Sequence, residues 1–137
     1  MQDYFHIQLD KTEIKTISAL GLAHMGDGVF ELLVRSWLCA HGKATSGNLH
    51  RATVSYVSAP AQARQMERML PLLTEEEAAI YRRGRNAHVH AVPKNATPGE
   101  YSRATGLESL FGALFLMGRT ERINELFALT MEDHDAL

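Results

Sequence analysis

Two isolated carboxylates, on stretches that otherwise read as apolar helices, are the residues of this chain best suited to chemistry. Asp27 lies between Gly26 and Gly28 in a run whose apolar residues recur at helical spacing. Each glycine costs a helix about 1 kcal/mol relative to alanine, and each lets a backbone, a metal ion or a phosphate group come close to Asp27. The alternative is a solvated aspartate beside a helix crossing that needs small residues.

The second carboxylate, Glu108, lies next to an apolar stripe with helical spacing, and Gly112 follows one turn later. Two such helices can cross and bring Asp27 and Glu108 together. A pair of carboxylates in a half-buried groove is costly unless a cation neutralises it. Because oxygen-only ligands favour Mg²⁺ or Mn²⁺ over zinc, the pair predicts a site for one of these ions.

Two further polar residues flank Asp27 on the same predicted helix. We interpret His24 as a residue that supports the metal pocket or packs the helix, in preference to a general base. Glu31 lies one turn after Asp27 on the same face. It either supports the site through water or forms a salt bridge with Arg35, and the sequence leaves both roles open.

These motifs together resemble the ribonuclease III family. Residues 25–31 are similar to its signature helix, and residues 107–112 are similar to its second acidic helix. Residues 82–87 and 118–123, with Pro93, Lys94, Asn95 and Tyr101, resemble the Mini-III branch in particular. The similarity runs from about residue 21 to residue 127.

Three positions depart from the full-length family pattern. That family has glutamates shortly before the signature aspartate, where this chain has Leu20 and Ala23. It also has an acidic residue three places before the second-helix glutamate, where this chain has Thr105. The Mini-III branch looks similarly reduced, so we assign the departures to that branch.

The resemblance implies a compact, all-α, dimeric domain over residues 1–137 that cleaves double-stranded RNA with Mg²⁺, or with Mn²⁺ in its place. Asp27 and Glu108 would hold the metal ion and form the catalytic site. The implied products carry 5′-phosphate and 3′-hydroxyl ends, and the implied task is maturation of precursor 23S ribosomal RNA. Whether a large-subunit ribosomal protein assists stays open. The alternative is a non-catalytic RNA-binding or ribosome-associated module, which the acidic residues missing at the three departing positions favour.

Basic residues are concentrated locally although the net charge of the chain is -2. Arg82, Arg83 and Arg85 share the end of one predicted helix, and Lys94 and Asn95 follow across a loop. Such a local basic surface can bind a phosphate backbone, with Lys94 supplying charge and Asn95 a hydrogen-bond donor. The alternative is a set of ordinary solvated helix charges.

Composition limits the remaining function classes. The 137 residues, 45% of them hydrophobic, suffice for one domain with its own core. No apolar run reaches the roughly 20 residues that span a bilayer, and the first residues lack the features of a signal peptide, so a cytoplasmic location is expected. Cys39 is the single cysteine, and its apolar neighbours predict a buried thiol. His88 and His90 have no third ligand nearby and do not indicate zinc.

Nearly the whole chain is expected to be helical, with one long loop at about residues 86–98. Thr74 and Glu77 have the spacing of a capping box that begins a helix. The apolar residues Phe30, Val34 and Trp37 exceed what one narrow core face requires and predict a homodimer interface. The helices are expected at about residues 11–20, 20–41, 49–58, 61–70, 75–85, 100–117 and 119–129.

Overall fold

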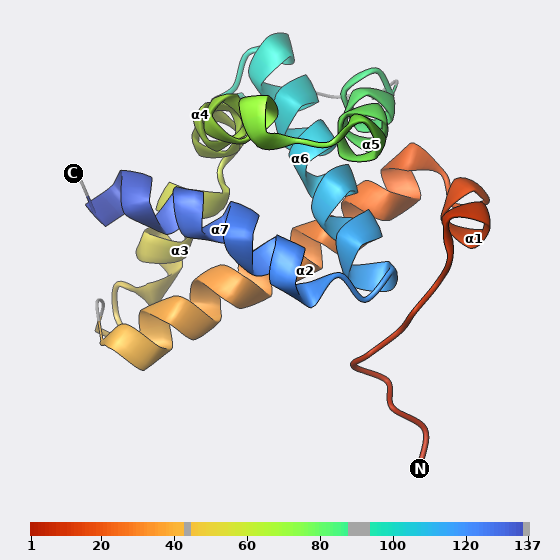
Figure 1. Cartoon of the computed structure of the whole chain (residues 1–137). Helices are drawn as coiled ribbons and strands as arrows, with labels where there is room; N and C mark the ends of the chain where they lie inside the picture. The colour runs from red at the N-terminus through yellow and green to blue at the C-terminus, as the bar shows by residue number, and fades with distance from the viewer. Residues whose placement is uncertain (43–44, 88–93, 136–137) are drawn as a thin grey trace.

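The computed structural model describes residues 1–42, 45–87 and 94–135, with side chains up to residue 131. All regular structure in these ranges is helical, which confirms the predicted all-α class. No helix among them has the length and apolar character needed to cross a membrane. The elements are α1 (Lys11–Lys15), α2 (Ala19–His41), α3 (Leu49–Val57), α4 (Ala59–Met69), the 3-10 turn η1 (Leu70–Leu72), α5 (Glu75–Arg85), α6 (Pro98–Leu116) and α7 (Thr120–Asp135) (Figure 1).

Capping residues explain where several helices begin. Thr74 and Glu77 form the predicted capping box of α5. The helix α4 begins two residues earlier than expected, because Ser58 accepts a hydrogen bond from the Ala61 amide and Pro60 fits the first turn, where no N–H is needed. Ser18 likewise starts α2, so the first predicted helix stops at Lys15. The helix α7 continues past the expected end, to Asp135.

The helix α6 runs through the middle of the molecule, with α2, α4, α5 and α7 packed around it (Figure 1). Every residue from 104 to 114 is buried except Glu108. Burying one large apolar side chain contributes about 1.5–3 kcal/mol, so this helix supplies much of the core. Glu108 is the one break in its buried run.

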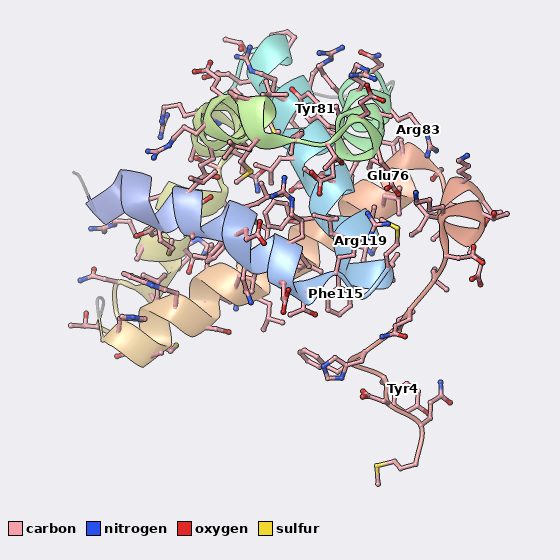
Figure 2. The ribbon with its side chains drawn as sticks, in the orientation of Figure 1. Tyr4, Glu76, Tyr81, Arg83, Phe115 and Arg119 are labelled. Atoms are coloured by element: carbon pink, nitrogen blue, oxygen red, sulfur yellow. The ribbon has the colours of Figure 1, made fainter. Side chains whose placement is uncertain are left out.

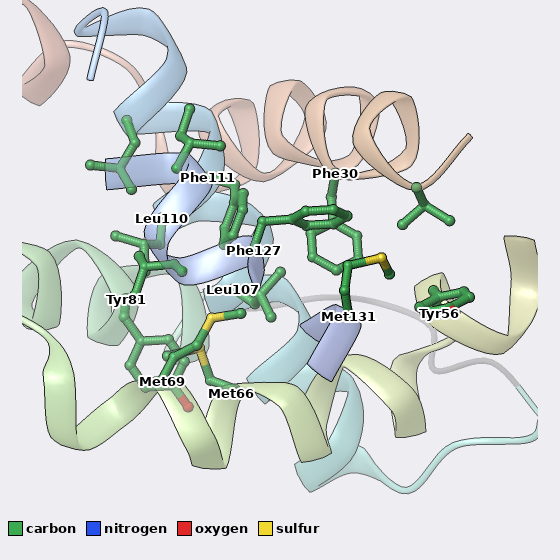
Figure 3. Close-up of a cluster of buried hydrophobic side chains, with 14 of the residues drawn as sticks. Phe30, Tyr56, Met66, Met69, Tyr81, Leu107, Leu110, Phe111, Phe127 and Met131 are labelled. Carbon is green, nitrogen blue, oxygen red and sulfur yellow. The ribbon is translucent and has the colours of Figure 1, made fainter. Parts of the chain in front are cut away.

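The largest part of the core lies where α2, α6 and α7 meet. The ring of Phe30 packs edge-on against Phe111 at 5.3 Å and against Phe127 at 5.5 Å between ring centroids (Figure 3). Phe30 and Val34 are both 0% exposed. The prediction that these two residues form a dimer interface was therefore wrong. The apolar surface of α2 is wide because α6 covers one part of it while α3 and α7 cover another.

Two other predictions about α2 concern Trp37, expected at the dimer interface, and Cys39, expected to be a buried thiol. Trp37 is half-buried and stacks on the His41 ring, with centroids 4.2 Å apart. Cys39 is exposed, so the prediction of a buried thiol was wrong. Near the end of α2 only one face of the helix is covered, and Cys39 lies on the uncovered face.

Candidate active site

The helices α2 and α6 cross at two glycines. A Cβ on Gly26 would overlap the carbonyl oxygen of Glu108, and a Cβ on Gly112 would overlap the carbonyl oxygen of Leu22. Gly28 differs, because among the described residues no atom outside its own turns of α2 lies within 4 Å of the place where its Cβ would stand. The helix crossing therefore requires Gly26 and Gly112, whereas Gly28 leaves open space next to Asp27.

This crossing brings the two carboxylates together. Asp27 is exposed at the surface of α2, and the mostly buried side chain of Glu108 reaches it from α6. Burial first, then the negative charge of Asp27 and a hydrogen bond to it, raise the pKa of Glu108 to about 8. The amide of Gln62 acts in the opposite direction by stabilising the Glu108 anion. A carboxyl with this pKa beside a second carboxylate is typical of a functional site.

Both carboxylates open onto a shallow depression of about 180 Å³. The three positions at which the longer family carries acidic residues, Leu20, Ala23 and Thr105, all line it. The Thr105 hydroxyl donates a hydrogen bond to the Tyr101 carbonyl oxygen at 2.9 Å. The depression thus keeps two carboxylates and replaces the other acidic positions with apolar or hydrogen-bonded side chains. Its remaining lining residues are His24, Asp27, Tyr101 and Glu108.

The donors in the depression fit a hard divalent cation. In the described part of the chain, no group of three or more His, Cys, Asp and Glu side chains could hold a metal ion. Two carboxylates are nevertheless sufficient for Mg²⁺, which binds through one or two of them and keeps several waters. A cation there would also offset the charge repulsion that contributes to the raised pKa of Glu108. The residues His88 and His90 lie outside the described ranges.

The other predicted residues near Asp27 have simpler surroundings. His24 is exposed and lies at the depression. Glu31 forms a salt bridge with Arg35, with Oε2 and Nη2 3.3 Å apart. Of the two roles left open for Glu31, the structure contains the salt bridge.

The predicted RNA-binding residues are all exposed, but some also contact the protein. Arg83 donates a hydrogen bond to the Ile17 carbonyl oxygen at 3.2 Å. The guanidinium of Arg85 lies 5.6 Å from the centroid of the Tyr81 ring. Arg82 lies beside them at the end of α5, and Lys94 and Asn95 precede α6.

Two other arginines in the chain stabilise the fold. Arg119 pairs with Glu76 (Figure 2), with Nη2 and Oε1 3.2 Å apart. Arg122 pairs with the buried Glu77 at 2.8 Å between Nε and Oε2. These pairs join α7 and the turn before it to α5. Arg119 and Arg122 therefore stabilise the fold, in contrast to the exposed arginines at the end of α5.

Sequence reasoning missed Gln62. It lies on α4, is 1% exposed, and lowers the pKa of Glu108, opposite to the effects of burial and of Asp27. The available signal was a pair of glutamines, Gln62 and Gln65, spaced three residues apart on a helix that had to bury one face.

The all-helical fold and the two carboxylates at the crossing of α2 and α6 agree with the resemblance to ribonuclease III-type nucleases. The model of the Ribonuclease III domain family matches residues 20–119. The chain is 44% identical to the Mini-ribonuclease 3 of Symbiobacterium thermophilum over 111 residues, which are 81% of this chain and 85% of that protein. It is 45% identical to the Mini-ribonuclease 3 of Enterococcus faecalis over 116 residues, 83% of this chain and 88% of that one.

A crystal structure shows the same fold. A protein from Fusobacterium nucleatum superposes with a TM-score of 0.82 and 28% identity, over 89% of this chain and 98% of that one. The chain therefore belongs to the ribonuclease III family, in its Mini-ribonuclease 3 branch, and it is an endoribonuclease. The family acts on double-stranded RNA and generally depends on a divalent metal ion.

Proposed function

We propose that this endoribonuclease hydrolyses the backbone of double-stranded RNA with Mg²⁺ held by Asp27 and Glu108. The supporting observation is the contact between these two carboxylates in an open depression, where the pKa of Glu108 is raised to about 8 by burial and by Asp27. Fold stability alone does not explain such a pair, because it opposes folding at neutral pH. Because both ligands are hard oxygen donors, Mn²⁺ should replace Mg²⁺.

In phosphodiester hydrolysis, bound Mg²⁺ activates a water and stabilises charge on the phosphate and on the leaving oxygen. The role of the protein is to hold two anionic carboxylates at a fixed separation. The crossing of α2 and α6 at their glycines sets this separation. The open space at Gly28 allows a phosphate group to approach Asp27. His24 and Tyr101 line the depression and can contact the same substrate group.

The exposed residues Arg82, Arg83, Arg85, Lys94 and Asn95 are proposed to bind the phosphate backbone of the duplex. An RNA duplex is recognised mainly through its shape, its phosphates and its 2′-hydroxyl groups, so sequence selectivity should be modest. A net charge of -2 excludes strong binding by bulk attraction and requires such a local basic surface.

Cleavage of both strands requires two sites, and a homodimer with a two-fold axis supplies them from one surface. Since Phe30 and Val34 are core residues, we place the proposed dimer interface on the exposed face of α2 instead. Leu32 is 47% exposed there and lines an apolar groove of about 120 Å³ together with Phe5 and Phe115. Phe5 belongs to the N-terminal arm, which extends away from the helices in Figure 1, and its neighbour Tyr4 is 78% exposed.

The resemblance to the Mini-III branch supports precursor 23S ribosomal RNA as the substrate, in a cytoplasmic setting. The direct test incubates the purified protein with long duplex RNA in Mg²⁺, in Mn²⁺ and in EDTA. We expect cleavage with either ion, none in EDTA, and products with 5′-phosphate ends. Binding of the duplex without cleavage would instead identify a non-catalytic RNA-binding module.

A further inference from the structure

Three arginines in the described part of the chain are half-buried, namely Arg103, Arg119 and Arg122. Arg119 and Arg122 each pair with a glutamate of α5. Arg103, on α6, forms no ion pair with any described residue, and its Nε atom is buried without a hydrogen-bond partner among them. Since arginines are rarely buried without a counter-charge, this side chain lacks a partner that the other two have.

The surroundings of Arg103 follow from the close packing of α5 on α6. A Cβ on Gly106, one turn after Arg103, would overlap the ring of Tyr81. A Cβ on Gly84 would overlap the Ser109 side chain, so each helix contributes a glycine to the contact. Because residues three apart on a helix are neighbours on its surface, Arg103 lies on the face of α6 that α5 covers.

A second guanidinium lies at the same tyrosine. Arg85, which directly follows Gly84 on α5, has its guanidinium carbon 5.6 Å from the centroid of the Tyr81 ring. Its Nε donates a hydrogen bond to the neutral Asn86 side chain at 3.3 Å, and no carboxylate of the described residues pairs with it. Burial raises the pKa of Tyr81, and the charges of Arg85 and Arg103 both oppose this rise. Two cations therefore lie near one tyrosine.

A bound anion would complete this arrangement. Two neighbouring guanidiniums without a carboxylate repel each other, and an anion between them would offset the repulsion. Arginine N–H groups match phosphate oxygens in geometry and charge and often bind them in pairs. Arg82 and Arg83, exposed on the last turn of α5, adjoin Arg85 and are already proposed to contact the RNA backbone. The anion that fits here is therefore a phosphate group of the duplex.

We propose that Arg103 is a further RNA-binding residue, which together with Arg85 binds one phosphate group of the duplex where α5 packs on α6. This inference rests on the proposed RNA surface at the end of α5. Arg103 precedes Glu108 by five residues, which places the two side chains about 140° apart around the helix. Arg103 therefore contributes to binding of the duplex and not to the chemistry at the carboxylates.

The test compares Arg103→Met with Arg119→Met in the full chain. Duplex affinity is measured in EDTA, which prevents cleavage, at several salt concentrations, and the Tm is measured without RNA. Arg103→Met should weaken binding by about 10-fold or more at low salt and lower the salt slope by roughly 0.7–0.9, the contribution of one phosphate contact. Its Tm should stay the same or rise, because methionine keeps the apolar stem and removes the unpaired charge. In Mg²⁺ the KM for the duplex should rise while kcat stays the same.

Arg119→Met makes the same chemical change at another half-buried arginine, one that pairs with Glu76. It should lower the Tm and keep the salt slope of the parent protein. A similar loss of Tm in both variants, with the slope unchanged in both, would show that Arg103 has only a structural role and would overturn the proposal.

A double variant tests whether Arg85 and Arg103 share one phosphate group. Arg85→Met should lower the salt slope by about as much as Arg103→Met does. The combined variant should lose little more, because residues that bind the same group do not act independently. Losses that add up to the contribution of two phosphate contacts would overturn the shared phosphate.

The failure of this inference can be told apart from the failure of the proposed function. A parent-like salt slope in Arg103→Met, with a lowered slope in Arg82→Glu combined with Arg85→Glu, overturns the role of Arg103 and leaves the RNA surface in place. Absence of duplex binding by the parent protein overturns both. If Arg103→Met does not fold, Arg103→Gln keeps a polar side chain there, and the same loss of slope is expected; a parent-like slope in that variant overturns the proposal.

Discussion

Gly26 of α2 and Glu108 of α6 pack backbone against backbone, so closely that a single Cβ on Gly26 would overlap the Glu108 carbonyl oxygen. The residue that bears the buried carboxylate is therefore also the residue at which the two longest helices touch. Asp27 follows Gly26 directly, so the same contact sets the separation of the two carboxylates. Fold stability and the geometry of the candidate site therefore both depend on Gly26.

The two glycines that flank Asp27 should respond differently to alanine. Gly26→Ala forces a Cβ into the backbone of α6, and overpacking of this kind costs about 1–3 kcal/mol or more. Gly28→Ala meets open space and should stabilise the protomer by up to about 1 kcal/mol through helix propensity. Thermal unfolding of both variants measures the difference. Equal Tm values would contradict the crossing geometry.

Neutral isosteres of the two carboxylates should abolish cleavage and leave the helical fold intact. Asp27→Asn and Glu108→Gln each remove one anionic ligand and weaken metal binding. Because the two residues act as a unit, the double variant should be little worse than either single one. Cleavage assays in saturating Mg²⁺ and far-UV circular dichroism provide the measurements. Near-native turnover in either single variant would remove that residue from the site.

The stability of the protein without metal should fall as the pH rises. Burial and Asp27 raise the pKa of Glu108 from 4.5 to about 8. Between these values the folded protein retains a proton that the unfolded chain has lost, so the free energy of unfolding decreases with pH and levels off above pH 8. The decrease from this group is at most about 1.4 kcal/mol per pH unit.

Urea unfolding in EDTA between pH 5 and pH 8 measures this dependence. Glu108→Gln removes the titrating group and should flatten the profile. Saturating Mg²⁺ should also flatten it, because a bound cation favours the anion. A parent protein whose stability rises steadily over this range in EDTA would argue against the raised pKa.

Charge reversal at the end of α5 should weaken duplex binding without unfolding the helix, since Arg82 and Arg85 are exposed. The logarithm of the affinity falls with the logarithm of the salt concentration by roughly 0.7–0.9 per phosphate contact. Arg82→Glu combined with Arg85→Glu should therefore lower the salt slope by up to the contribution of two phosphate contacts. Arg51→Glu on α3 is a control that reverses one charge, instead of two, at another exposed position. The same slope in the double variant and the parent would place the duplex elsewhere.

A charge at Leu32 should separate the proposed dimer without unfolding the protomer, because Leu32 is 47% exposed. Leu32→Glu should sediment as a monomer and nick single strands at most. Val34→Glu buries an unpaired charge in the core and should unfold the chain instead. A parent protein that sediments as a monomer at micromolar concentration while cutting both strands would contradict the dimer.

Much of the local structure followed from the sequence. Apolar spacing predicted the helices, and the capping box of Thr74 and Glu77 predicted the start of α5, because these signals involve only neighbouring residues. The motifs around Asp27 and Glu108 were sufficient to indicate the family. They also pointed to a crossing of these two helices, although the roles of both residues in metal binding remain predictions.

Only the tertiary structure decided what covers each face of the helices. Helical spacing shows that Phe30 and Val34 are on an apolar surface, but not whether other helices of the chain or a second protomer bury them. Both are 0% exposed in the protomer, and Phe127 of α7 packs on Phe30. The two glycines beside Asp27 look alike in sequence, and only the position of α6 separates Gly26 from Gly28. Gln62 lies 46 residues from Glu108 in sequence, and no local pattern relates them. Contacts of this kind depend on how whole helices pack, which the spacing within any one helix does not determine.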